Sequence, residues 1–204
     1  MGELRRLHGE VLATMAAYQE PMAERSIREH RGHYRQKDRL VDVAEFCVAH
    51  FRGDILEIGA AAGETTRLFA EIAAHYGRRV LVVDPWEVQS WRYEVFQELT
   101  VPYRSVIDVV KASSFGETGS AAIRERDLCF TYVDGLHEHD ACYSDIVNAA
   151  HTAGAIAVDD IFYLIGLAKA FYEASTELGR IAVARISPPM REGYLLPTYE
   201  GGQP

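Results

Sequence analysis

Residues 54–63 most constrain how this chain can fold, because an apolar run there passes directly into a turn of small residues. The run contains Ile55, Leu56 and Ile58, and a helix-forming segment at 64–72 follows at once. We expect a buried strand, a tight turn and a helix, which together form a nucleotide-binding corner. Glycines let the backbone approach a ligand, and the free N–H groups of the first helical turn point toward it.

The spacing within this turn indicates which nucleotide is bound. A dinucleotide site needs the spacing G-x-G-x-x-G, which seats a pyrophosphate on the helix. Here Glu57 precedes small residues at every second position, namely Gly59, Ala61 and Gly63. This pattern resembles motif I of the class I S-adenosylmethionine (SAM)-dependent methyltransferases, in which the turn wraps the methionine and ribose portion of SAM. The resemblance implies that these four residues bind SAM. Ala61 stands where the family usually has glycine, and its methyl group predicts a slightly wider loop.

Length and charge limit the organisation and the partners of the chain. Its 204 residues suffice for one domain with an extension, and we predict a helical extension at 1–50 and a methyltransferase domain at 51–204. The net charge of −9, without a basic run, argues against a nucleic-acid substrate. We find no signal peptide and no apolar run of about 18 residues, so we expect a cytoplasmic protein without a membrane span. A homodimer is plausible.

The three cysteines are Cys47, Cys129 and Cys142, and they show no C-x-x-C spacing. This distribution predicts buried free thiols in a reducing compartment.

Apolar and helical segments alternate along the rest of the chain. Further strands are predicted at 80–83, 105–110, 128–133, 155–158, 181–186 and 193–196, and helices at 117–126, 137–150 and 161–178. This alternation predicts an α/β fold with a mostly parallel sheet covered by helices on both faces. The resemblance implies a Rossmann-like sheet of seven strands with the last strand antiparallel.

The first 50 residues show a helical period, with a break at Pro21, and predict two or three helices. Their basic side chains are Arg25, Arg28, Arg31, Arg35, Lys37 and Arg39. A solvated helix face is one interpretation of this basic stretch. A cap over the active site that meets an anionic or polar acceptor is the other.

In a parallel sheet, ligands bind beyond the carboxyl ends of the strands. Asp84 ends the second strand, about 20 residues after the glycine turn, which is the position of an acid that accepts bonds from ribose hydroxyls. Trp86 either covers the adenine or belongs to the core. By the family pattern, the polar run containing Ser113 and Ser114 contacts the adenine ring.

Three acids end the next two strands: Asp134, then the pair Asp159 and Asp160. Carboxylates this close repel one another unless a cation pairs with them, and Mg²⁺ prefers oxygen ligands. The arrangement resembles the metal-dependent O-methyltransferases, including catechol O-methyltransferase and the macrolide-sugar enzymes. The resemblance implies that Mg²⁺ or another divalent cation binds these three acids, that Asp134 also adjoins the cofactor and takes part in catalysis, and that the substrate is a small hydroxylated molecule. Alternatively, Asp159 caps the next helix and Asp160 is an acid of its first turn.

His137 lies three residues after Asp134, where the catechol enzyme has a lysine that takes the proton from the acceptor. A histidine can do so near neutral pH, so we assign His137 as the catalytic base. The rival interpretation is that His137, His139 and Asp140 cap the helix or bind a softer metal.

The main hypothesis is thus a Mg²⁺-dependent SAM O-methyltransferase. Two alternatives stay open: a metal-independent methyltransferase acting on a nitrogen or carboxylate, and a SAM-binding module without catalysis. A NAD-dependent oxidoreductase fits least well, because the glycine spacing does not suit a pyrophosphate.

Overall fold

The computed structural model describes residues 37–87, 90–184 and 192–198. The predicted break at Pro21 and most of the basic N-terminal stretch lie outside these residues, so the division between an extension and a domain stays a prediction.

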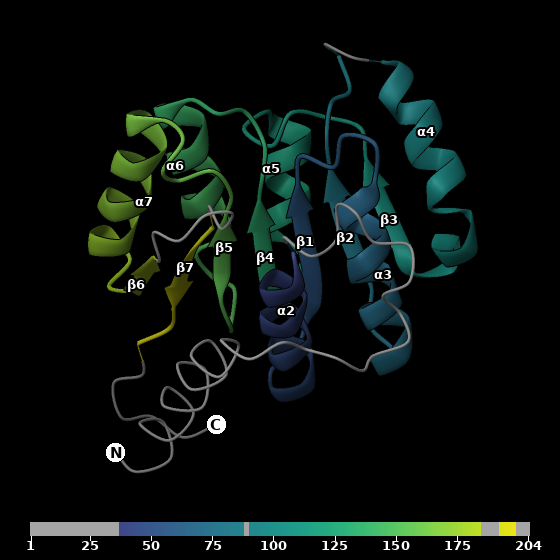
Figure 1. Ribbon diagram of the computed structural model, residues 1–204, viewed down its shortest axis with the longest axis horizontal. Coiled ribbons are helices and arrows are strands. Elements are labelled where there is room, and N and C mark those ends of the chain that lie inside the picture. The colour runs from purple at the N-terminus through teal and green to yellow at the C-terminus, as the bar shows by residue number, and fades with distance from the viewer. Residues whose placement is uncertain (1–36, 88–89, 185–191, 199–204) are drawn as a thin grey trace.

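A single seven-stranded sheet forms the centre of the molecule (Figure 1). Its strands are β1 (Asp54–Ile58), β2 (Val80–Val83), β3 (Ile107–Val110), β4 (Leu128–Val133), β5 (Ile156–Val158), β6 (Ile181–Ala184) and β7 (Gly193–Leu196). The order across the sheet is β3-β2-β1-β4-β5-β7-β6, and β7 runs antiparallel to both of its neighbours. The predicted α/β fold with an antiparallel last strand is confirmed. The strand order reverses at β1 and β4, which places a ligand site at their carboxyl ends.

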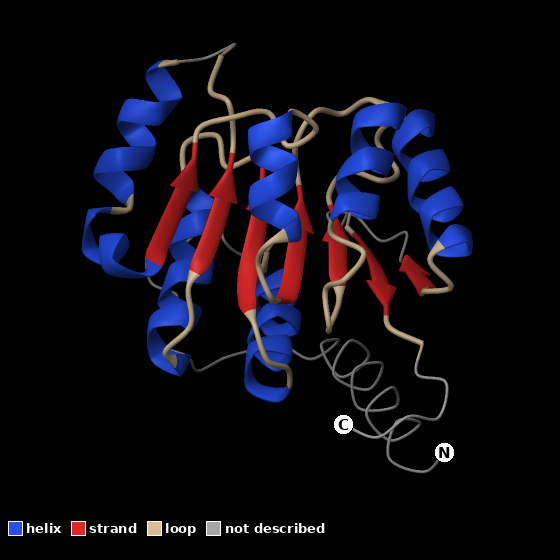
Figure 2. Ribbon diagram, turned by 180° about the vertical axis from the view of Figure 1, so that it is seen from behind, coloured by secondary structure: helices blue, strands red, loops and turns tan. Residues whose placement is uncertain are grey.

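Helices cover both faces of the sheet, as Figure 2 shows from behind. They are α2 (Asp38–His50), α3 (Glu64–Tyr76), α4 (Trp91–Leu99), α5 (Glu117–Arg124), α6 (His139–Asn148) and α7 (Ile165–Glu177), with a 3-10 helix η3 at Val101–Val106. Helices α2, α3 and α4 supply one apolar core, and α5, α6 and α7 supply the other. In the described part of the chain, no helix has the length and apolar character needed to cross a membrane.

Four segments differ from the prediction. The strand expected from residue 105 begins only at Ile107, because a 3-10 helix with Pro102 in its first turn continues to Val106. Helix α4 was not predicted, and Phe96 is its one buried residue, so its apolar periodicity is weak. Helix α6 begins at His139, because Glu138 is extended and acts as its N-cap. Helix α7 begins at Ile165, after a turn in which Asp160 has a φ of 51°.

The three cysteines are buried free thiols, as predicted. Burial raises the pKa of each to about 12, so they stay protonated at neutral pH.

Candidate active site

A cavity of about 480 Å³ lies along the carboxyl ends of β1, β2 and β4 and beside the loop that follows β3. Seven of the nine predicted cofactor residues line it: Gly59, Ala61, Asp84, Trp86, Ser113, Ser114 and Asp134. The structure therefore brings together side chains from four separated segments, as the prediction required. The other two predicted residues, Glu57 and Gly63, do not line the cavity.

The glycine turn is shaped by contacts inside the protein. Gly59 has a φ of 84°, and a Cβ there would lie 2.1 Å from the carbonyl oxygen of Asp134. Gly63 has a φ of 86°, and its Cβ would lie 2.8 Å from Cδ2 of Phe96. Close approach to a ligand is the reason expected for these glycines, whereas the contacts seen are with Asp134, after β4, and with Phe96 of α4. Ala61 keeps the left-handed conformation, with a φ of 47°.

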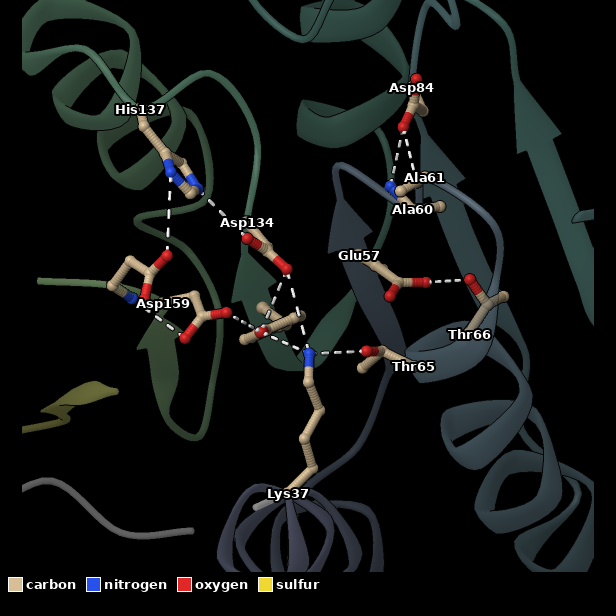
Figure 3. Close-up of polar contacts among 12 residues, drawn as sticks. Lys37, Glu57, Ala60, Ala61, Thr65, Thr66, Asp84, Asp134, His137 and Asp159 are labelled. Carbon is tan, nitrogen blue, oxygen red and sulfur yellow. Dashed lines mark hydrogen bonds and ion pairs between the residues drawn. The ribbon is translucent and has the colours of Figure 1, made fainter. Parts of the chain in front are cut away.

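Asp84 binds the amides of that turn. Its Oδ2 accepts hydrogen bonds from the backbone N–H groups of Ala60 (2.8 Å) and Ala61 (3.0 Å), and its Oδ1 accepts one from Trp86 (2.7 Å). The carboxylate thus ties the end of β2 to the turn after β1, as Figure 3 shows for Ala60 and Ala61. It still lines the cavity, so it both shapes the turn and faces the ligand space.

Trp86 belongs to the core and also contributes to the cavity wall. Its side chain is 4% exposed, its ring packs against Tyr93 and Phe96, and its indole N–H donates to the carbonyl oxygen of Ala61 at 2.7 Å. The core interpretation is therefore seen, while the predicted cover of the adenine stays a prediction.

The loop after β3 places two serines at the far end of the cavity. Ser114 is buried and hydrogen-bonds to Asp145 of α6, whose pKa burial raises to about 6. The hydroxyl of Ser113 is also buried, and within the described residues it has no hydrogen-bond partner. A ligand atom in the cavity can supply that missing partner, which fits the predicted contact with an adenine edge.

Glu57 lies behind the turn, fully buried on β1. Thr66 of α3 donates a hydrogen bond to its carboxyl group (Figure 3). Burial raises the pKa of Glu57 to about 8, so the group carries a proton at neutral pH. The bond between Glu57 and Thr66 thus holds α3 against β1 behind the turn.

Beyond Asp134 the cavity meets a cluster of charged and polar groups, drawn in Figure 3. The hydroxyl of Tyr132 lies 2.8 Å from Oδ2 of Asp159 and 3.2 Å from Oδ2 of Asp134. The ammonium of Lys37 donates to that same hydroxyl at 3.0 Å and to Oγ1 of Thr65 at 2.8 Å. The sequence gives no signal for Tyr132, whose neighbours in β4 are all apolar or uncharged. Lys37 belongs to the basic stretch for which a solvated helix face and a cap over the active site were the two interpretations.

His137 adjoins the same cluster from the loop before α6. Its Nε2 lies 3.3 Å from Oδ1 of Asp134, and its Nδ1 lies 3.9 Å from Oδ2 of Asp160. The hydrogen bond with Asp134 raises the pKa of His137. Burial raises the pKa of Asp134 itself, even though this bond opposes the shift. The predicted proximity of His137 to Asp134 is therefore present.

His139 and Asp140 lie on the outer surface of α6. The two ring nitrogens of His139 are each 2.7 Å from a carboxylate oxygen, one of Asp140 and one of Glu173. The N-cap of α6 is Glu138, so these residues do not cap the helix, and they are separate from the cavity.

The three acids predicted to hold a divalent cation do not form a metal-binding group. Within the described residues, no three His, Cys, Asp or Glu side chains are placed to hold an ion together. Oδ1 of Asp159 accepts from the backbone N–H of Asp160, while the ring of His137 lies between Asp134 and Asp160. The expected helix-capping role of Asp159 is not seen either, because α7 begins only at Ile165. As arranged, these residues do not fit Mg²⁺, which requires near-octahedral oxygen coordination.

The fold and the cavity define a nucleoside-binding α/β protein, and comparison with known proteins identifies the family. The model of a methyltransferase domain family matches residues 56–161, more than half of the chain. The chain therefore belongs to this family, and it is a class I SAM-dependent methyltransferase, as the motif predicted.

Solved structures share the fold at low sequence identity. The TDP-rhamnose 3'-O-methyltransferase CalS11, an enzyme in calicheamicin biosynthesis, is 16% identical, with a TM-score of 0.65, and the match covers 96% of this chain and 95% of that one. An O-methyltransferase from Bacillus cereus in complex with S-adenosylhomocysteine (SAH) is also 16% identical, with a TM-score of 0.62 and coverage of 93% and 90%. No curated protein sequence matches this chain significantly.

Proposed function

We propose that this methyltransferase transfers the methyl group of SAM to a hydroxyl group of a small molecule. The observation that carries the proposal is that Asp134 belongs both to the cavity and to the cluster beside it. It lines the cavity with the glycine turn and Asp84, and it also contacts His137 and Tyr132. A methyl donor in the cavity thus lies next to groups able to position a hydroxyl and accept its proton.

On the donor side, we assign the ribose to Asp84 and the adenine edge to Ser113 and Ser114. The N–H groups of Ala60 and Ala61 hold Asp84 in place before the ligand arrives. A carboxylate fixed in this way pays little ordering entropy on binding. The buried, unpartnered hydroxyl of Ser113 supports the adenine assignment.

On the acceptor side, we assign His137 as the base. The acceptor oxygen attacks the methyl carbon as the S–CH₃ bond breaks, the O–CH₃ bond forms, and SAH departs as a neutral thioether. The hydroxyl proton passes to His137, which Asp134 orients through the 3.3 Å contact. Holding both reactants in line supplies much of the rate enhancement.

The acceptor class is a proposal as well. Both relatives named above are O-methyltransferases, and one acts on a sugar, so sugar hydroxyls are the first acceptors to test. The chain has a net charge of −9, which favours a small molecule over a nucleic acid. The predicted dependence on Mg²⁺ is not part of the proposal, because the acids as arranged do not fit the ion, and no step above requires it.

A methyl-transfer screen tests the proposal. The purified chain is incubated with isotope-labelled SAM and panels of sugars, catechols and polyketide-like alcohols, each with Mg²⁺ and with EDTA, and products are identified by mass spectrometry. We expect an O-methylated product. Methylation of nitrogen or carboxylate acceptors alone, or SAM binding without turnover on any panel, would overturn the hydroxyl assignment.

Two histidine variants provide a matched comparison. His137→Ala should lower turnover by about 10²–10⁴-fold, the usual contribution of a general base. His139→Ala removes a neighbouring ring that pairs with Asp140 and Glu173 outside the cavity, so it should retain turnover. Equal losses in both variants would remove His137 from the chemistry.

A further inference from the structure

Lys37 is the one residue of the predicted basic stretch that reaches the acceptor side of the site in the described part of the chain. It lies immediately before α2, and its ammonium is held by two segments that are distant in sequence. It donates to Thr65 of α3 and to Tyr132 of β4, and it lies 3.9 Å from Oδ2 of Asp134, which follows β4 (Figure 3). It also lies 5.0 Å from the centroid of the Tyr132 ring. Such convergence fixes a long side chain that would otherwise be free to rotate.

The groups around this ammonium carry the negative charge of the site. The Tyr132 hydroxyl has a single proton, and it donates that proton toward Asp159 or Asp134 while accepting from Lys37. Lys37 therefore interacts with Asp134 directly and with Asp159 through Tyr132. The carboxylates of a partly buried cluster require a nearby positive charge to stay ionised together.

From this arrangement we infer that Lys37 takes the place of a divalent cation at the acceptor side, so that methyl transfer proceeds without a metal ion. The inference rests on the proposed function. Lys37 acts as a positioning residue: it holds Asp134 and Tyr132, and through Asp134 it fixes the orientation of His137. Its side chain is 27% exposed, and that of Asp134 is 26% exposed, so the pair lies at the mouth of the site.

The geometry explains why an ion and this ammonium exclude each other. A Mg²⁺ bound to Asp134 and Asp159 would have to approach the oxygens that face Tyr132 and Lys37, at about 2.0–2.1 Å from each ligand. The lysine charge would then lie within a few ångströms of the ion and repel it. Removing the charge should consequently uncover the carboxylates and create an affinity for ions that the natural chain lacks.

A purely structural role for Lys37 predicts something different. If the side chain only pinned α2 to the sheet, its loss would lower the stability of the fold and leave ion binding unchanged. A gain of ion binding separates the two roles.

Manganese titration followed by electron paramagnetic resonance provides the test, with Mn²⁺ as the probe. The proteins are the full natural chain, Lys37→Met, Lys37→Arg and the double variant Lys37→Met/Asp134→Asn. We expect Lys37→Met to bind Mn²⁺ at least about tenfold more tightly than the natural chain, because a repelling charge is gone. Lys37→Arg keeps the charge and should behave like the natural chain, and the double variant should lose the gain. An unchanged affinity in folded Lys37→Met would overturn the inference.

If Lys37→Met does not fold, Mn²⁺ binding to the natural chain still tests the inference. One equivalent of Mn²⁺ bound to the natural chain, and lost in Asp134→Asn, would overturn the inference. The absence of such binding, with turnover unchanged by EDTA, is the expected result. Calorimetric titration with SAH, run in parallel, separates this outcome from failure of the proposed function. A chain that binds SAH but methylates no hydroxyl contradicts the function, whereas Mn²⁺ binding contradicts only the role of Lys37.

Discussion

The proposed donor and acceptor sides of the site are built in different ways. On the donor side, the glycine turn and Asp84 are held mainly by backbone contacts: N–H groups that bind a carboxylate, and a glycine without room for a Cβ. On the acceptor side, Lys37, Tyr132 and Asp134 form a network of side chains from separate segments. The shape of the cavity therefore depends on the backbone of the fold. The proposed chemistry beside it depends on the balance between charged side chains.

The largest expected effect concerns the backbone contact at Gly59. Gly59→Ala should destabilise the fold by about 2–5 kcal/mol, since the new Cβ would meet the Asp134 carbonyl and the left-handed conformation adds strain. Gly77→Ala is the control, because Gly77 is also left-handed, at a φ of 66°, but nothing lies within 4 Å of its added Cβ. Urea unfolding of both variants measures the difference. Equal destabilisation would show that conformation alone, and not the contact with β4, requires glycine at position 59.

The next effect concerns binding on the donor side. Asp84→Ala should weaken SAH binding by at least about 3 kcal/mol, because two charge-assisted hydrogen bonds of about 1.5–3 kcal/mol each are lost and the turn amides lose their partner. Asp108→Ala on β3 is the control: its carboxylate pairs with Arg79 and Arg126 away from the cavity. Calorimetry should show almost unchanged affinity for that variant. Unchanged affinity in Asp84→Ala would remove its ribose role.

These two residues also show which parts could be predicted from sequence. The turn and Asp84 follow a spacing that is visible along the chain itself, so the α/β fold and most of the cavity lining were predictable. The cluster at Lys37 was not, because residues 37, 65 and 132 come together only through the packing of α2 and α3 on β4. A lysine ahead of a helix and a tyrosine in an apolar strand have no sequence signal for this contact. The metal prediction has the same limit, since it rests on acids at strand ends, whereas the positions of their side chains depend on tertiary packing.

A smaller effect concerns the stability contributed by Glu57, the buried acid that does not line the cavity. The folded chain keeps Glu57 protonated up to a pKa of about 8, whereas the unfolded chain releases that proton above about 4.5. Between these values the folded state binds more protons, so this group lowers stability as pH rises. Glu57→Gln removes the penalty and should gain at least about 1 kcal/mol over the natural chain between pH 5 and pH 8. Urea unfolding at several pH values measures the gain, and a gain independent of pH would contradict the assignment.

The smallest effect concerns the alanine in the turn. Ala61 adopts a φ of 47°, which glycine reaches without strain. Ala61→Gly should stabilise the chain by about 0.5–1 kcal/mol, since relief of strain exceeds the added flexibility of the unfolded state. Thermal unfolding measures the change. A loss of stability would show that the methyl group contributes packing to the turn.

A crystal structure of the chain with bound SAH tests the central claim most directly. We predict that the ribose hydroxyls lie within hydrogen-bond distance of Asp84, that the adenine edge lies beside Ser113 and Ser114, and that the sulfur faces Asp134. SAH bound elsewhere, or an adenosyl group without contact to Asp84, would contradict the assignment of this cavity as the donor site.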